Sequence, residues 1–103
     1  MLYKLLNVPL VMGKAIVTLK IMPSSPDVDL EAVSKTTQEF INEFTGGSEI
    51  RTKVEPLAFG LNSLSITFVM DESLGEVEPL QQKINDIEGV NSAEIVDMRR
   101  ALG

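Results

Sequence analysis

The stretch EPLAFGLNSLSITFVM, residues 55–70, decides the fold predicted for this chain. In its second half a large apolar residue recurs at every second position: Leu64, Ile66, Phe68 and Met70. A period of two is typical of a β-strand with one buried face. In its first half, Ala58-Phe59-Gly60 interrupts the apolar pattern, and we expect these residues to form a turn.

A second strand is predicted over residues 48–57, before that turn. Apolar and small residues alternate there with charged ones, so that one face would hold Ile50, Thr52 and Val54, and the other Arg51, Lys53 and Glu55. Two strands separated by a short turn containing glycine are expected to pair as a β-hairpin.

The sequence on either side of the hairpin predicts one helix and one further strand. Residues 15–21 alternate as a strand, and residues 27–44 have apolar side chains at helical spacing before Gly46-Gly47. A second helix is predicted over residues 74–87, closed by Gly89, and a last strand over residues 90–98 with Ala93 and Ile95 facing inward.

The predicted order is therefore βαββαβ. Each helix has one apolar stripe and each strand one apolar face, and both are buried when the two helices stack on one face of an antiparallel sheet. The fold class is α+β, a ferredoxin-like sandwich with a four-stranded antiparallel sheet and two helices on one face. In it the first and last strands are neighbours.

The length of 103 residues suits one domain. We place this domain at residues 12–103. Residues 1–11, MLYKLLNVPLV, are interpreted as an N-terminal extension, either non-native or disordered. They lack the charged start and small-residue cleavage site of a signal peptide, and no run in the chain reaches the roughly 18 apolar residues of a membrane span.

Composition excludes several classes of function. The chain has no cysteine and no histidine, which removes disulfides, the usual zinc sites and imidazole catalysis. Its net charge of −6 argues against binding of nucleic acid or anionic membrane. We therefore predict a cytoplasmic protein without metal or cofactor, whose partner is basic or apolar.

No enzymatic site is visible in the pattern. Asp71, Glu72, Glu76 and Glu78 gather near the start of the second helix, where carboxylates complement the helix dipole and aid solubility. The serines lack a base at a diagnostic spacing, so a nucleophile is not predicted. We expect no catalytic residue and no small-molecule substrate.

Two features are not required by the fold. One is Phe59, whose ring would either fold back over the core or stand exposed on the turn. The other is the pair Arg99-Arg100, which places two of the nine basic residues near the C-terminus. Spacing alone leaves Phe59 open between the two alternatives, and the arginine pair open between a frayed, solvated tail and a functional element.

Three segments of the chain resemble a known family. They are VEPLAFGL at residues 54–61, IEGVNS at 87–92 and IVDMRR at 95–100, and they occur in the family's order and at its separations. The sequence over residues 12–101 resembles the guanine-nucleotide exchange domain of translation elongation factor 1-beta in its short archaeal form. The family has the ferredoxin-like fold expected above.

The resemblance implies a nucleotide exchange factor acting on the GTPase elongation factor 1-alpha, without bond chemistry of its own. It implies that Phe59 contacts the GTPase and that Arg100, at the position of a family lysine, enters the magnesium region of the nucleotide site. The implied partner-binding residues are Phe59, Gly60, Asn62, Met98, Arg99 and Arg100.

The chain departs from the eukaryotic pattern at two places. Asn62-Ser63 stands where those members have a lysine pair, and Arg100 replaces a lysine by a planar, bulkier cation. A second hypothesis, from another class, is a small-ligand-sensing regulatory module of the same fold.

Overall fold

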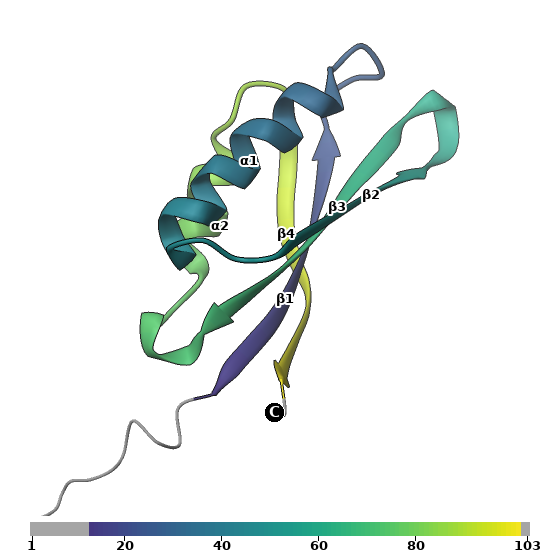
Figure 1. Cartoon of the computed structure of the whole chain (residues 1–103). Coiled ribbons are helices and arrows are strands. Elements are labelled where there is room, and N and C mark those ends of the chain that lie inside the picture. Colours follow the sequence, from purple (N-terminus) through teal and green to yellow (C-terminus); the bar gives the residue numbers. More distant parts are fainter. Residues whose placement is uncertain (1–12, 102–103) are drawn as a thin grey trace, which may run out of the picture.

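A computed structural model describes residues 13–101 (Figure 1). The prediction for residues 1–11 therefore lies outside the described residues. The elements follow the predicted order, βαββαβ: β1 Lys14–Pro23, α1 Leu30–Thr45, β2 Ile50–Pro56, β3 Asn62–Asp71, α2 Glu78–Asn85 and β4 Val90–Ala101.

The strands form one antiparallel sheet in the order β2-β3-β1-β4. Both helices lie on the same face of it (Figure 1). The ferredoxin-like α+β sandwich is confirmed, as is the pairing of the first and last strands. Neither helix of residues 13–101 is long and apolar enough to cross a membrane.

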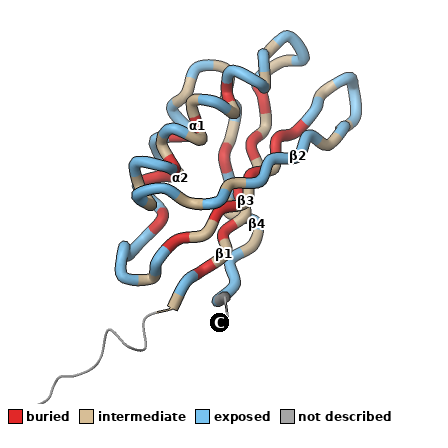
Figure 2. Tube along the Cα trace, in the orientation of Figure 1, coloured by how far each residue is buried: buried red, intermediate tan, exposed pale blue. Residues whose placement is uncertain are grey.

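The core lies between the helices and the two central strands (Figure 2). The predicted alternation is confirmed on β1 and β3, whose inward side chains are all buried: Ala15, Val17, Leu19, Ile21, Leu64, Ile66, Phe68 and Met70. The helices, with the residue that precedes α2, add a further apolar set: Val33, Ile41, Val77, Leu80 and Ile84.

Helix α1 begins three residues later than predicted, at Leu30 instead of residue 27. The reason is its cap: the Asp29 carboxylate accepts the backbone N–H groups of Glu31 and Ala32 at 3.0 and 3.4 Å. Its end is as predicted, because Gly46 adopts the left-handed conformation with φ 78°.

Helix α2 is shorter than the predicted 74–87. A separate 3₁₀ turn, Glu72–Leu74, precedes it and is capped by Asp71, and Gly75 with φ 87° breaks the backbone before the helix. Gly89 does not close the helix, which ends at Asn85. It forms the turn into β4, where a Cβ would lie 3.1 Å from a Val28 methyl.

Strand β4 is longer than the predicted 90–98 and contains a β-bulge. Ile95 pairs with Leu19 and Asp97 with Thr18, so Val96 is an extra residue. Beyond the bulge the faces exchange, and Arg100, paired with Ala15, lies on the helix side of the sheet. Of the frayed, solvated tail considered for Arg99-Arg100, the fraying is wrong, because both residues are paired with β1, whereas their side chains are largely exposed.

Strand β2, predicted over 48–57, has its expected apolar face largely uncovered. Ile50 packs against the core, but Val54 is 54% exposed. The end of β2, up to Pro56, and the start of β3, from Asn62, extend past the helices as a two-stranded arm (Figure 1). The arm ends in the turn that contains Phe59.

Candidate partner-binding site

The tip of the arm is a tight turn over Ala58–Leu61. The N–H of Leu61 donates to the carbonyl of Ala58 at 3.3 Å, and both central residues have positive φ, 62° for Phe59 and 75° for Gly60. Positive φ at both central positions defines the type I′ hairpin turn, which favours glycine and asparagine. Phe59 is the only non-glycine residue with positive φ in residues 13–101.

The ring of Phe59 is 93% exposed, so it does not cap the core. Exposure forgoes roughly 1.5–3 kcal/mol of burial free energy for a side chain of this size. The left-handed backbone costs a further 1–2 kcal/mol, approximately, for a residue with a Cβ. Both costs fall on one residue at the end of the arm, with Gly60 and Asn62 exposed beside it.

The arm is closed firmly just below the turn. The N–H of Leu57 donates to the carbonyl of Leu61 at 2.6 Å, and Pro56 faces Asn62 in the strand register. The Ser63 side chain is fully buried and its hydroxyl donates to the Glu55 carbonyl at 3.4 Å. These contacts fix the direction in which the tip points.

At the opposite end of the sheet, Arg100 is tied to the turn after β3. Its Nε donates to Glu72 Oε2 at 3.0 Å. The other oxygen, Oε1, accepts the N–H of Gly13 at 3.0 Å, and the N–H of Glu72 donates to the Gly13 carbonyl at 2.9 Å. The Gly13 N–H, and after it Arg100, hold the pKa of Glu72 below its usual range.

Arg99 lies on the other face of β4, paired with Ile16 on the side that the helices leave open. Its Nε donates to Asp97 Oδ2 at 2.9 Å. The two neighbouring arginines therefore point to opposite faces of the sheet, each with one carboxylate.

Beside Arg100 lies a shallow groove of about 400 Å³. Its apolar lining comes from the strands and from the segment leading into α2: Ala15, Met70, Val77, Ile95 and Met98. Carboxylates of Glu72, Glu76 and Glu78 also line it. Met98 is about half exposed and belongs to this groove, so it lies near Arg100 and far from the arm.

The predicted site residues thus form two groups that the fold does not bring together. Phe59, Gly60 and Asn62 lie at the start of β3, whereas Arg100 pairs with Ala15, which in turn faces Met70 at the end of β3. Strand β3 has ten residues, which at roughly 3.3 Å each separate its ends by about 30 Å.

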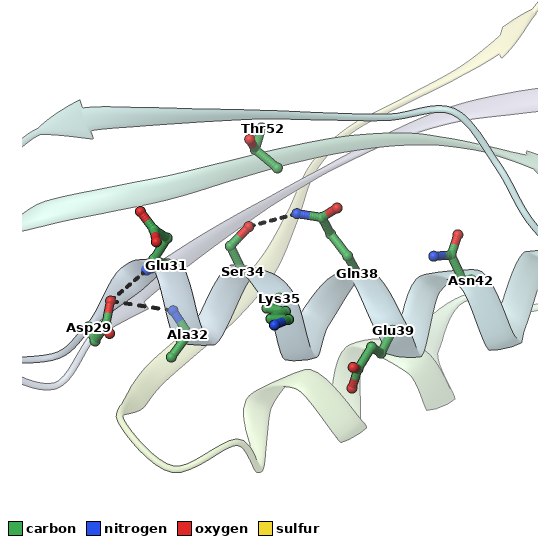
Figure 3. Close-up of a pocket in the computed structure, with 9 residues that line it drawn as sticks. All are labelled: Asp29, Glu31, Ala32, Ser34, Lys35, Gln38, Glu39, Asn42 and Thr52. Carbon is green, nitrogen blue, oxygen red and sulfur yellow. Dashed lines mark hydrogen bonds between the residues drawn. The ribbon is translucent and has the colours of Figure 1, made fainter.

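A larger hollow, of about 680 Å³, lies between α1 and β2 (Figure 3). Most of its side chains are polar, and three of them make local contacts: Asp29 caps α1, and Gln38 donates to Ser34 at 2.9 Å. None of the predicted site residues lines it. Within residues 13–101, no three carboxylates gather closely enough to hold a metal ion.

Two contributions to the site were not predicted from the sequence. Glu72 was grouped with the other carboxylates, and its contact with Arg100, 28 positions away, follows only from the fold. The left-handed backbone of Phe59 is also not predicted, because the type I′ turn favours asparagine, aspartate or glycine at this position and a phenylalanine there is no signal for it.

The fold is that of a small α+β domain, and its most exposed large apolar residue, Phe59, stands at the tip of the arm. Comparison with known sequences identifies the domain: residues 16–101 match the family described as the EF-1 guanine nucleotide exchange domain. The chain belongs to this family.

Curated relatives are similar over most of the chain. A protein named Elongation factor 1-beta from Methanothermobacter thermautotrophicus is 42% identical over 92 residues, which cover 88% of this chain and 100% of the relative. One of the same name from Methanobrevibacter smithii is 38% identical, covering 88% and 100%. A third, from Methanosphaera stadtmanae, is 37% identical, covering 82% and 92%.

Among solved structures, the designed protein Foldit4 is similar with a TM-score of 0.59, covering 87% of this chain and 98% of its own. At 15% identity this likeness supports the fold alone.

Proposed function

We propose that this chain is a guanine-nucleotide exchange factor for elongation factor 1-alpha, promoting GDP release and GTP reloading during protein synthesis. Family membership and the curated relatives named Elongation factor 1-beta support this function. The observation that carries it is Phe59, an exposed ring on a fixed turn within the family's Pro-Leu-Ala-Phe-Gly segment.

At the arm, Phe59 acts as the anchor. Its ring buries in an apolar pocket of the GTPase and regains the burial free energy that exposure forgoes in the free protein. The turn sets the ring's direction before binding, so little order is lost on association. Gly60 permits the turn, and Asn62 offers a polar contact beside the ring.

At the other end, Arg100 acts by charge. Its guanidinium competes with magnesium at the nucleotide site of the GTPase and perturbs the loops that hold the phosphates. Met98 and Arg99 flank it, on the groove side and on the open face respectively.

The separation of about 30 Å along β3 means that the two groups contact different regions of the GTPase. Exchange follows by linkage: whatever the factor gains in affinity for the empty GTPase, GDP loses in affinity for the complex. No covalent bond changes, so the chain is not an enzyme and needs no cofactor. Its place of action would be the cytoplasm, without direct contact to nucleic acid.

The test is stopped-flow release of a fluorescent GDP analogue from the cognate elongation factor 1-alpha. Release should accelerate with the concentration of this protein and reach a plateau. A release rate that stays at its intrinsic value at all concentrations would exclude the exchange function. Thermal shifts with amino acids, measured beside it, would detect the ligand-sensing alternative.

A further inference from the structure

The guanidinium of Arg100 is held by one edge only. Its Nε donates to Glu72 Oε2, and the described residues give no hydrogen bond to either terminal nitrogen. A guanidinium has two edges that can donate hydrogen bonds to a carboxylate, one that includes Nε and one formed by the two terminal nitrogens. The outer edge of Arg100 is therefore unoccupied within residues 13–101 and projects from a side chain that is 69% exposed.

Glu72 itself is fixed more firmly than a surface carboxylate usually is. Its side chain is 23% exposed, and its second oxygen accepts the Gly13 N–H while its own N–H donates to Gly13. It also belongs to the 3₁₀ turn capped by Asp71. A carboxylate whose second oxygen is held by Gly13, on a backbone that is itself bonded to Gly13, can hold a flexible arginine in one orientation.

Stability is a poor explanation for this pair. Ion pairs in which one partner is mostly solvated contribute little to folding. The Gly13 contact needs only an acceptor oxygen, which a neutral side chain would also provide. The effect of the Glu72 charge is to restrain the side chain of Arg100, which would otherwise adopt many rotamers.

We infer that Glu72 is a positioning residue, which holds Arg100 so that its outer edge is presented to a carboxylate of the GTPase. This inference rests on the proposed function. The acceptor is assigned to the protein and not to the nucleotide, because a contact with GDP would favour the bound state, whereas exchange requires affinity for the empty state.

The free protein gives the first test, independent of any GTPase. In NMR spectra of the full chain, the Nε–H of Arg100 should be shifted and slow to exchange, and Glu72→Gln should return it to the position of a solvated arginine. The matched control is Asp97→Asn, which breaks an equivalent Nε contact of 2.9 Å and should move only Arg99. An Arg100 signal that Glu72→Gln leaves unchanged would overturn the inference.

The second test measures GDP release at saturating exchange factor. Glu72→Gln should lower the maximal rate about three- to tenfold, the scale of restoring freedom to one long side chain. The half-saturating concentration should stay within about twofold, because the anchor is distant. Asp97→Asn should leave the maximal rate within about a factor of two.

A double-mutant cycle separates positioning from a general structural role. In an Arg100→Gln background, Glu72→Gln should slow release no further, since it acts only through Arg100. Arg100→Gln and Glu72→Gln should both weaken binding to the nucleotide-free GTPase. The inference would be contradicted if Glu72→Gln slowed release as much in the Arg100→Gln background as in the wild type, or if Arg100→Gln bound the nucleotide-free GTPase as tightly as the wild type. The proposed function would still hold if the wild-type protein accelerated exchange.

Discussion

The two ends of the sheet differ in their chemistry: one is apolar and the other is charged. The arm ends in five residues without an ionisable side chain, Leu57–Leu61, and holds one ring out on a left-handed backbone. The other end is held together by charge, with Glu72 joining Arg100 to the start of β1. The orientation of Phe59 is set by the backbone of its turn, and that of Arg100 by a side-chain contact with Glu72.

This difference predicts a division of labour. A preorganised apolar ring gives affinity, because it loses little entropy and gains burial on binding. A presented positive charge acts on the release of GDP, because it competes with magnesium for the charged groups of the GTPase at the nucleotide site. Substitutions at the arm should therefore mainly weaken binding, and substitutions at the charged end should mainly lower the maximal rate of GDP release.

The largest effect is expected from Phe59→Ala. Loss of a central aromatic anchor should weaken binding to the nucleotide-free GTPase by at least about 2 kcal/mol, roughly 30-fold in Kd. Isothermal titration calorimetry measures it. The maximal release rate at saturation should change less than about twofold. Val54→Ala, an exposed apolar residue on the same arm, is the control and should bind normally. Unchanged affinity of Phe59→Ala would remove the arm from the interface.

Next in size is Arg100→Gln, which should act mainly on the maximal rate of GDP release and little on the half-saturating concentration. We expect the maximal rate of GDP release to fall by about tenfold or more, since contacts of a charged group are worth roughly 1.5–3 kcal/mol. The half-saturating concentration should change by less than about threefold. Arg51→Gln is the matched control, because this arginine also pairs with a glutamate, Glu49, on an exposed strand. A loss confined to the half-saturating concentration would show that both ends serve affinity alone.

The separation into two ends could be foreseen in part. Period-two patterns in β1 and β3 predicted the buried faces correctly, because these central strands are covered along their length. On the edge strand β4 the prediction that Ala93 and Ile95 face inward is also correct, but the pattern does not extend over the whole of either edge strand. On β2 the arm leaves Val54 uncovered, and on β4 the bulge at Val96 exchanges the faces of every later residue. An extra residue in one strand has no mark in its own sequence.

The site itself depended on tertiary geometry. Motif likeness pointed to Phe59 and Arg100, but spacing could not decide whether the ring was exposed, since that follows from the backbone of the turn. Glu72 could not be found at all, because its role arises when the 3₁₀ turn meets the ends of β1 and β4. The apolar spacing predicts a helix from residue 74, but the 3₁₀ turn capped by Asp71 and ended by Gly75 makes α2 begin later.

A smaller effect, on stability, tests whether the tip stores backbone strain. Phe59→Gly should raise the free energy of unfolding relative to Phe59→Ala by about 0.5–1 kcal/mol. Relief of the left-handed backbone outweighs the added entropy of glycine in the unfolded chain. Urea unfolding of the two variants measures the difference. If glycine proves no more stable than alanine, Phe59 is not strained, and the ring's exposure alone distinguishes the arm.

The smallest effect is a pH dependence confined to the charged end. The Gly13 N–H and Arg100 lower the pKa of Glu72, so folding favours its ionised form. The resulting stability is fully present above the ordinary glutamate value of about 4.3, and it is lost as pH falls through the lower folded-state pKa.

The midpoint of thermal unfolding should therefore drop less steeply below about pH 4.3 in Glu72→Gln than in the wild type. Asp71, whose pKa the Ser73 N–H lowers in the same direction, keeps part of the slope in that variant. By contrast, the difference between Phe59→Gly and Phe59→Ala should not vary with pH, because residues 57–61 contain no ionisable side chain. Parallel curves for the wild type and Glu72→Gln would show that the carboxylate is not tied in solution, and the two ends would then differ only in charge.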